Sequence, residues 1–345
     1  MSHDRIVGKW ENEEFTILDS AVVPIYLAKT GNVNRWLVTR AIDYHRPNSR
    51  LLKRALRLTE KDDLSIVISV NAATITDNYW IKPFESNLTY NDIRFNNDYF
   101  AKLALIGDYD SYNDVAFNQV SHTPELTNIG SFEKCWRLIG GEWWMVKSAN
   151  RLQQFSELFI FEFGRYLGFN MAEYIGSTKS VMTRDFTDGA RYNYEPAYSF
   201  MGDNEDYIAV VKELKRIAPN TVPDYFRMIF LDTIVANPDR HTFNFGLLRD
   251  AETGDIISLA PNYDNNMALV ARGYPKNIKR EKDILVKYLN ELLQFDTSLK
   301  QYIPHISKND IQTVLTKLNM KVRTDTVISF IMNGYMQIDG VEKNI

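Results

Sequence analysis

The chain has 345 residues, of which 45% are hydrophobic and 24% are charged, a composition typical of one large or two ordinary globular domains. Its formal net charge of −4 argues against a general nucleic-acid surface, and its single cysteine, Cys135, excludes a disulfide within the chain. We find no apolar signal core at the start and no apolar run of bilayer length. We therefore expect a cytoplasmic protein that has no membrane partner and does not bind nucleic acid directly.

The first 118 residues carry few motifs. Short apolar runs at 15–18 and 21–27 favour strands, whereas residues 49–58 favour a helix. The stretch from Gly107 to Asn118 is polar and rich in Asp and Asn, which is typical of a domain boundary. We predict an N-terminal α/β region over residues 1–118 and a second domain over 119–345.

A β-hairpin is predicted around Gly140-Gly141, because two glycines between aromatic-rich runs are typical of a two-residue turn. In that register Lys147 lies opposite Lys134, which ends a loop of small residues around Gly130. Backbone N–H groups of such a loop can bind phosphate, and a nearby lysine adds a point charge. The alternative is an ordinary surface lysine at a strand end.

A helix is predicted over residues 151–167, ending at Gly168. Glu157 is acidic on this otherwise apolar helix, and two interpretations stay open. Glu157 either pairs with Lys147 and orients it toward phosphate, or it is a solvated residue near the helix start. A strand that runs into a loop is then predicted over residues 180–186.

A helix is predicted to start at residues 221–224, and it should be buried because residues 225–236 are apolar almost all round. The helix should stop at Asn237, since a residue before proline avoids the α region. Strands at 243–248 and 256–260 then form a hairpin. Further helical patterns complete a mostly helical second half, at residues 206–217, 278–293, 311–318 and 327–332.

The segment after the buried helix contains Asp239 and, five residues later, Asn244. The hairpin brings Asn244 near a second acid, Asp264. One carboxylate can orient an attacking hydroxyl, while an amide oxygen and a second carboxylate hold the Mg²⁺ that neutralises phosphate charge. The pattern therefore indicates phosphoryl transfer. The alternative is a polar loop followed by a surface hairpin.

Five motifs, in order along the chain, resemble the HipA-like serine/threonine protein kinases, which are similar to phosphatidylinositol kinases in the Asp-Arg-His-x-x-Asn element. They are the loop at 127–134, Trp144-Met145-Val146-Lys147, Ser156-Glu157, Asn237-Pro238-Asp239-Arg240-His241-x-x-Asn244 and Ala260-Pro261-Asn262-Tyr263-Asp264. The resemblance covers roughly residues 120–335. It implies an α+β, bilobal protein-kinase-like fold, with a β-rich N-lobe at 119–190 and a mostly helical C-lobe at 191–345.

The resemblance implies Asp239 as the catalytic base and Asn244 and Asp264 as ligands of Mg²⁺. It also implies a set of residues that contact or support ATP: Ile129, Gly130, Ser131, Phe132, Lys134, Lys147, Glu157, Asp185, Phe186, His241 and Tyr263. This sequence departs from the family's pattern at two places, in the loop and in the segment expected beside adenine. Phe132 stands where the family often has a polar residue, and the segment 183–186 lacks the family's common Glu-Arg-Phe run.

The activity that the resemblance implies is ATP-dependent transfer to Ser or Thr hydroxyls of a protein substrate, in a toxin-type enzyme that phosphorylates itself and has an antitoxin-like partner. Within the loop, Thr127 is the preferred site of self-phosphorylation over Ser131, because we expect it at the loop's outer end. A lipid or small-molecule kinase is one alternative, since the fold does not determine the acceptor. A regulatory module that only binds nucleotide is another.

Overall fold

The computed structural model describes residues 1–58, 61–110 and 122–341. These residues form two compact units. Unit 1 takes the described residues within 1–148, 182–195 and 248–257, and unit 2 takes those within 149–181, 196–247 and 258–345. The predicted domain boundary at 107–118 falls largely on residues 111–121, which lie outside the described residues.

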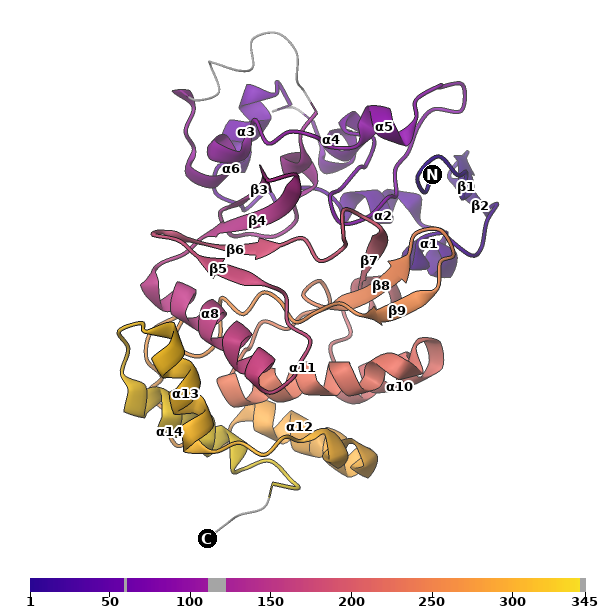
Figure 1. The fold of residues 1–345 in the computed structure, drawn as a ribbon. Coiled ribbons are helices and arrows are strands. Elements are labelled where there is room, and N and C mark those ends of the chain that lie inside the picture. The colour runs from indigo at the N-terminus through magenta and orange to yellow at the C-terminus, as the bar shows by residue number, and fades with distance from the viewer. Residues whose placement is uncertain (59–60, 111–121, 342–345) are drawn as a thin grey trace. The chain divides into compact units, whose positions relative to one another are not determined.

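Unit 1 combines short helices with two hairpins (Figure 1). Its elements are β1 (Gly8–Glu11), β2 (Glu14–Ile17), α1 (Ile25–Thr30), α2 (Val33–Val38), α3 (Ser49–Ala55), α4 (Asp63–Ser69), α5 (Tyr90–Ile93), α6 (Ala101–Ile106), the 3-10 helix η1 (Pro124–Thr127), β3 (Lys134–Ile139) and β4 (Glu142–Ser148). The strand predicted over 21–27 is wrong, because Pro24 precedes a helix there and Gly31 ends that helix in the left-handed conformation.

The hairpin of β3 and β4 has the predicted register, with Lys134 opposite Lys147. Gly140 and Gly141 both have positive φ, at 62° and 87°, as a tight hairpin turn requires. Trp136 of β3 packs into a buried cluster with Trp80, Phe100 and Leu126. The core of unit 1 therefore holds the strand that follows the small-residue loop.

Unit 2 is mostly helical. Its helices are α8 (Arg151–Tyr166), α9 (Tyr198–Met201), α10 (Tyr207–Ile217), η2 (Pro219–Thr221), α11 (Val222–Val235), α12 (Ile284–Phe295), η3 (Thr297–Tyr302), α13 (Lys308–Leu318) and α14 (Thr324–Tyr335), with the strand β5 (Tyr174–Gly176). Four strands span the sequence boundaries between units: β6 (Ser180–Arg184), β7 (Tyr192–Pro196), β8 (Gly246–Asp250) and β9 (Ile256–Leu259). The strand orders are β1-β2, β3-β4-β6-β5 and β7-β8-β9.

Helix α11 is the buried helix predicted from its apolar sequence. It lies among α10, α12 and α14 (Figure 1). The helix predicted from residue 278 begins only at Ile284, because Asp283 caps it by accepting hydrogen bonds from the next turn. Arg280, just before that cap, donates to the carbonyl oxygens of Thr233 and Ile234 at 2.6 and 3.0 Å. It thereby satisfies the C-terminal end of α11.

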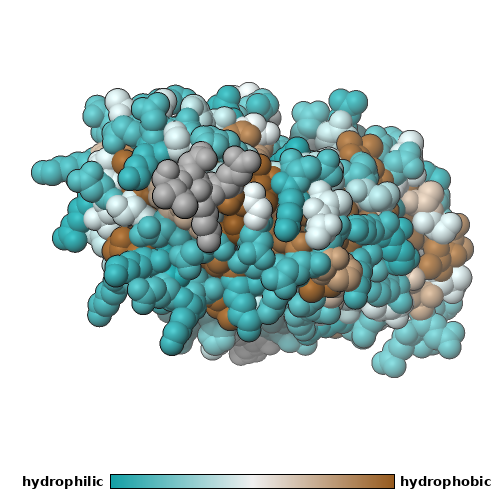
Figure 2. Space-filling view, turned by 90° about the horizontal axis from the view of Figure 1, so that it is seen from below, coloured by the Kyte–Doolittle hydropathy of each residue, from teal (hydrophilic) through white to brown (hydrophobic). Residues whose placement is uncertain are grey.

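The face shown in Figure 2 is mostly hydrophilic, and its hydrophobic residues form separate small areas. Where its residues are described, that face shows no extended apolar surface. Within the described part of the chain, every helix is too short or too polar to cross a bilayer.

Candidate active site

The segment after α11 turns sharply to present Asp239. Ala236 ends the helix with a φ of 52°, and the side-chain nitrogen of Asn237 donates to Asp232 Oδ1 at 2.9 Å. The side-chain oxygen of Asn237 then accepts from the Asp239 N–H at 3.2 Å. Asp239 is partly exposed at the end of this turn. The helix end predicted from Pro238 thus sets the direction of the loop.

The buried side chain of Arg240 joins the two segments that carry the predicted metal ligands. Its guanidinium binds both carboxylate oxygens of Asp232, at 2.7 and 2.9 Å. The same group donates to the carbonyl oxygens of Asn244 and Tyr263, at 2.7 and 2.6 Å. Two more bonds reach the side-chain oxygens of Asn262 and Asn265. The loop at 239–244 and the segment at 262–265 therefore meet on one cation.

Arg240 stays charged in this environment. Burial acts to lower its pKa, but the charge and hydrogen bonds of Asp232 outweigh that effect and raise the pKa of Arg240 above its usual value. Asp232 has a fully buried side chain. Sequence reasoning assigned no role to this pair, although a lone acid in an apolar helix eight residues before Arg240 is a usable signal.

Asn244 is oriented by its own loop. Its side-chain nitrogen donates to the Asp239 carbonyl at 2.8 Å, and its backbone N–H donates to the His241 carbonyl at 2.8 Å. With the amide nitrogen engaged, the amide oxygen is the group available to a cation. His241 accepts from the Phe243 N–H through Nδ1 at 3.2 Å, which closes the same turn.

Asp264 lies in the left-handed region, with a φ of 59°, and two buried side chains hold its backbone there. The Asp264 N–H donates to the hydroxyl of Tyr174 at 2.9 Å. The next N–H, of Asn265, donates to Glu157 Oε2 at 2.9 Å. Burial raises the pKa of Tyr174 well above its usual value, so the hydroxyl stays neutral.

Glu157 is buried rather than solvated, so the surface interpretation of this residue is wrong. Its carboxylate supports the segment that carries Asp264. The predicted pairing of Glu157 with Lys147 stays a prediction. Lys147 itself is buried on β4 of unit 1, opposite the buried Lys134.

The small-residue loop of unit 1 is exposed at its tip and buried at both ends. Ile129 and Ser131 are exposed, and Gly130 has a φ of 108°. A Cβ at position 130 would collide with Lys134 Nζ, so this ammonium group lies against the loop backbone. The glycine is needed both for its φ and for this close approach.

Thr127 does not lie at the loop's outer end, so that expectation is wrong. It is buried in η1, and its hydroxyl donates to the Ala73 carbonyl at 2.7 Å. Among the two candidate acceptors in the loop, Ser131 is the exposed one.

The predicted adenine-side residues form a turn in unit 1. The Asp185 carboxylate accepts from the N–H and hydroxyl of Thr187, at 3.0 and 2.8 Å. Burial raises the pKa of Asp185. Phe186 packs edge-on against Tyr194. These contacts give Asp185 a role in the turn, and its contact with adenine stays a prediction. In unit 2, the Tyr263 hydroxyl donates to the Phe243 carbonyl at 2.8 Å.

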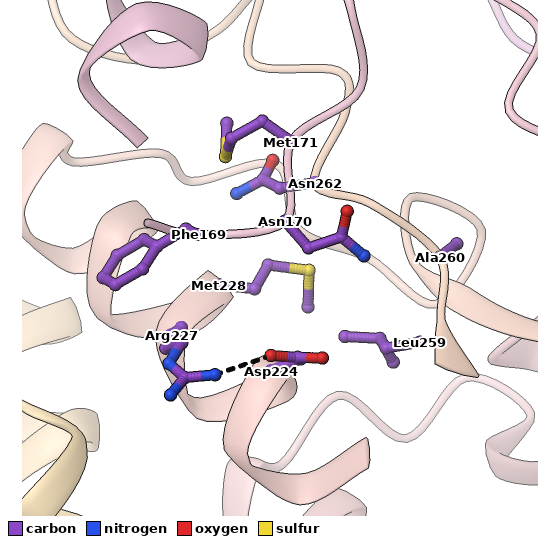
Figure 3. Close-up of a pocket in the computed structure, with 9 residues that line it drawn as sticks. All are labelled: Phe169, Asn170, Met171, Asp224, Arg227, Met228, Leu259, Ala260 and Asn262. Carbon is purple, nitrogen blue, oxygen red and sulfur yellow. Dashed lines mark hydrogen bonds and ion pairs between the residues drawn. The ribbon is translucent and has the colours of Figure 1, made fainter. Parts of the chain in front are cut away.

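A small pocket in unit 2 lies beside Asn262 (Figure 3). Apolar side chains such as Met171 and Met228 line it, together with the ion pair of Asp224 and Arg227 at 2.8 Å. Its free volume of about 10 Å³ has room for about one water molecule. None of the predicted site residues lines this pocket, so it is not a candidate for the nucleotide.

Comparisons with known proteins identify the family of this chain. The model of the HipA-like C-terminal domain matches residues 129–324, more than half of the chain. No curated protein matches. Among solved structures, the chain is similar to one from the Shewanella oneidensis MR-1 toxin–antitoxin complex of HipA, HipB and operator DNA. That match has a TM-score of 0.53 and 11% identity, and covers 99% of each chain.

A second solved structure is the Helicobacter pylori proinflammatory kinase CtkA, with a TM-score of 0.48 and 18% identity, covering 59% of this chain and 90% of that one. The similarity to the Shewanella chain confirms the predicted α+β, kinase-like fold. The match to the family model over more than half the length shows that the chain belongs to the HipA-like C-terminal domain family.

Proposed function

We propose that this chain is an ATP- and Mg²⁺-dependent protein kinase that transfers the γ-phosphate to Ser or Thr hydroxyls. The observation that carries the proposal is the arrangement around Arg240. Through that one buried guanidinium, the loop of Asp239 and Asn244 is joined to the segment that carries Asp264. A polar surface loop would not need such a scaffold.

The residues present fit a magnesium ion. Asn244 and Asp264 offer hard oxygen ligands, and the Asn244 amide is turned so that its oxygen is the available atom. Mg²⁺ usually takes one or two carboxylates and completes its shell with water and phosphate. When bound, the ion would neutralise charge on the transferring phosphate. Asp239 would orient the acceptor hydroxyl and accept its proton.

The remaining roles follow the family resemblance. Residues 129–134 would bind phosphate oxygens through backbone N–H groups, and Lys147 would add positive charge. His241, Tyr263 and the turn at 185–186 would lie beside the nucleoside. We include an antitoxin-like partner in the proposal, because the similar Shewanella chain comes from a complex with HipB. The reaction would take place in the cytoplasm.

The direct test is incubation of the purified protein with γ-labelled ATP and Mg²⁺, alone and with a cell lysate. Label on Ser or Thr of protein supports the proposal. Label on lipid or on a small molecule instead favours the alternative acceptors. Nucleotide binding without any transfer indicates a regulatory module. The Asp239→Asn variant, treated identically, shows whether the label depends on the proposed base.

Removing the Asp264 carboxylate is expected to abolish the Mg²⁺-dependent part of nucleotide binding. For Asp264→Asn we expect the Kd of Mg²⁺-ATP to rise at least about tenfold, about 1.4 kcal/mol. The Kd of ATP measured in EDTA should change much less, because the carboxylate acts on the nucleotide through the Mg²⁺ ion. Titration calorimetry with and without Mg²⁺ measures both values. Asp224→Asn, a partly exposed acid of the same unit, is the matched control. If nucleotide binding depends equally on Mg²⁺ in both variants, Asp264 is not a ligand of the metal.

Self-phosphorylation is expected at Ser131 rather than Thr127. Ser131 is exposed, whereas the Thr127 hydroxyl is buried and hydrogen bonded. A phosphate adds about 1.5 to 2 negative charges, which would repel the ATP phosphates and lower the affinity for nucleotide. Mass spectrometry after incubation with Mg²⁺-ATP should find phosphate at Ser131 in the wild type and none in Asp239→Asn. Phosphate at Thr127 alone, or equal phosphate in both proteins, contradicts the prediction.

A further inference from the structure

Arg46 of unit 1 binds both ends of the small-residue loop. It lies in the turn between α2 and α3, outside the residues that the family model matches. Its guanidinium donates to the Asn128 carbonyl at 3.2 Å and to the Lys134 carbonyl. These two carbonyls flank the loop residues 129–133. The side chain of Arg46 is only 1% exposed, so these bonds are made without competition from water.

Glu125 fixes the position of this guanidinium. Its Oε2 accepts from Arg46 Nη2 at 3.2 Å and from the Asn128 side chain at 3.0 Å. Its Oε1 accepts from the Trp136 N–H, at the start of β3, at 2.7 Å. Burial raises the pKa of Glu125 to about 7, while Arg46 acts in the opposite direction. The carboxylate therefore ties the guanidinium to the residues on both sides of the loop.

The residues before the loop are also held by the N-terminal region. The Ile42 N–H donates to the Leu126 carbonyl at 2.9 Å, and the Thr127 hydroxyl donates to the Ala73 carbonyl. Both contacts anchor η1 to segments that precede the family domain. The loop's tip is different, because Ile129 and Ser131 are exposed and Gly130 adopts a conformation that few other residues tolerate.

We propose that Arg46 is a positioning residue for nucleotide binding. By holding the carbonyls of Asn128 and Lys134 at a constant separation, it keeps the intervening loop ready to present its N–H groups to phosphate. The planar fork of arginine can bind two carbonyls and a carboxylate at once, which a flexible ammonium group does less well. A loop that is ordered beforehand binds its ligand more tightly, because less conformational entropy is lost on binding. This role rests on the proposed function, and it makes the N-terminal region a support for the loop of the nucleotide site.

The test compares two buried ion pairs of unit 1. The double variant Arg46→Met, Glu125→Gln removes the clamp without leaving an unpaired buried charge. The control Arg40→Met, Asp77→Asn removes a similarly buried pair, whose distances are 2.8 and 3.0 Å and whose other bonds go to residues 72–79. Arg46→Lys keeps the charge opposite Glu125, and it serves as a second variant should the double variant not fold.

Two measurements separate positioning from general stability. The first is the Kd of Mg²⁺-ATP, with KM and kcat where transfer is observed. We expect the Arg46 double variant to raise Kd and KM at least about tenfold, with kcat within about threefold of the wild type. The Kd and KM of Arg46→Lys should lie between those of the wild type and the double variant. In the Arg40 control, both values should stay within about twofold of the wild type. The second is amide hydrogen exchange of residues 129–133 in nucleotide-free protein, which should quicken in the Arg46 variants alone.

The outcomes distinguish this role from the proposed function. A wild type that does not bind Mg²⁺-ATP contradicts the proposed function, and with it the role in nucleotide binding. A wild type that binds, with affinity and loop exchange unchanged in the Arg46 variants, overturns the positioning role alone. Equal losses of nucleotide affinity in the Arg46 and Arg40 variants also overturn the positioning role, because they would show a purely structural effect.

Discussion

Replacing Asp239 with asparagine is expected to lower phosphoryl transfer by about 10²- to 10⁴-fold, the contribution typical of a positioned general base. The affinity for Mg²⁺-ATP should stay within about threefold. Asparagine keeps the size of the side chain but cannot accept the proton of the acceptor hydroxyl. The backbone of this residue is held independently, through the bonds of Asn237 to its N–H and of Asn244 to its carbonyl. The loop should therefore keep its shape in the variant.

The measurement is the rate of label transfer at saturating ATP, together with the Kd of Mg²⁺-ATP. Asp224→Asn is the control for loss of a partly exposed carboxylate in the same unit, and it should transfer at nearly the wild-type rate. Activity retained in Asp239→Asn would show that the catalytic loop has been assigned wrongly. A large loss of nucleotide affinity would instead move Asp239 into the metal site.

Replacing Arg240 with methionine is expected to destabilise the protein by about 3–5 kcal/mol, because it leaves the buried Asp232 carboxylate without its cation. The rate of phosphoryl transfer should fall as well, since the variant also loses the bonds that hold the Asn244 and Tyr263 carbonyls. Denaturant unfolding gives the change in free energy. Arg227→Met, on the helix that carries Asp232, removes a partly exposed ion pair, and it should cost about 0–1 kcal/mol.

A double variant separates the two effects of Arg240. Asp232→Asn combined with Arg240→Met removes the unpaired charge, so it should recover part of the stability. It should not recover transfer, because the guanidinium that bonds the carbonyls of Asn244 and Tyr263 is then missing. Recovery of both properties would mean that Arg240 contributes stability alone.

Features that depend on neighbouring residues in the chain followed from sequence. The register of β3 and β4 was predictable because Gly140 and Gly141 allow a two-residue turn with positive φ at both positions. The end of α11 was predictable because Pro238 restricts the residue before it. Local patterns of this kind act through the backbone itself, so distant contacts rarely override them.

The strand predicted over residues 21–27 is wrong. A short apolar run does not separate a strand from a buried helix, and the helix here begins directly after Pro24. Its residue Leu27 packs into a cluster with Trp36, Leu37 and Tyr79. Pro24 before the helix and Gly31 after it are local signals that separate this helix from a strand, which the apolar run alone does not.

The sequence by itself determined the order of the acid, amide and acid at Asp239, Asn244 and Asp264, from which phosphoryl transfer is proposed. Only the tertiary structure decided which side chains hold the segments that carry these residues. Glu157 and Asn265 are 108 residues apart, and Arg46 and Lys134 are 88 apart. Whether a charged side chain is solvated or buried depends on such distant partners, because burial is favourable only where a partner compensates the loss of water. The sequence leaves Glu157 open between a paired and a solvated role and assigns none to Arg46, and the folded chain supplies the partners of both.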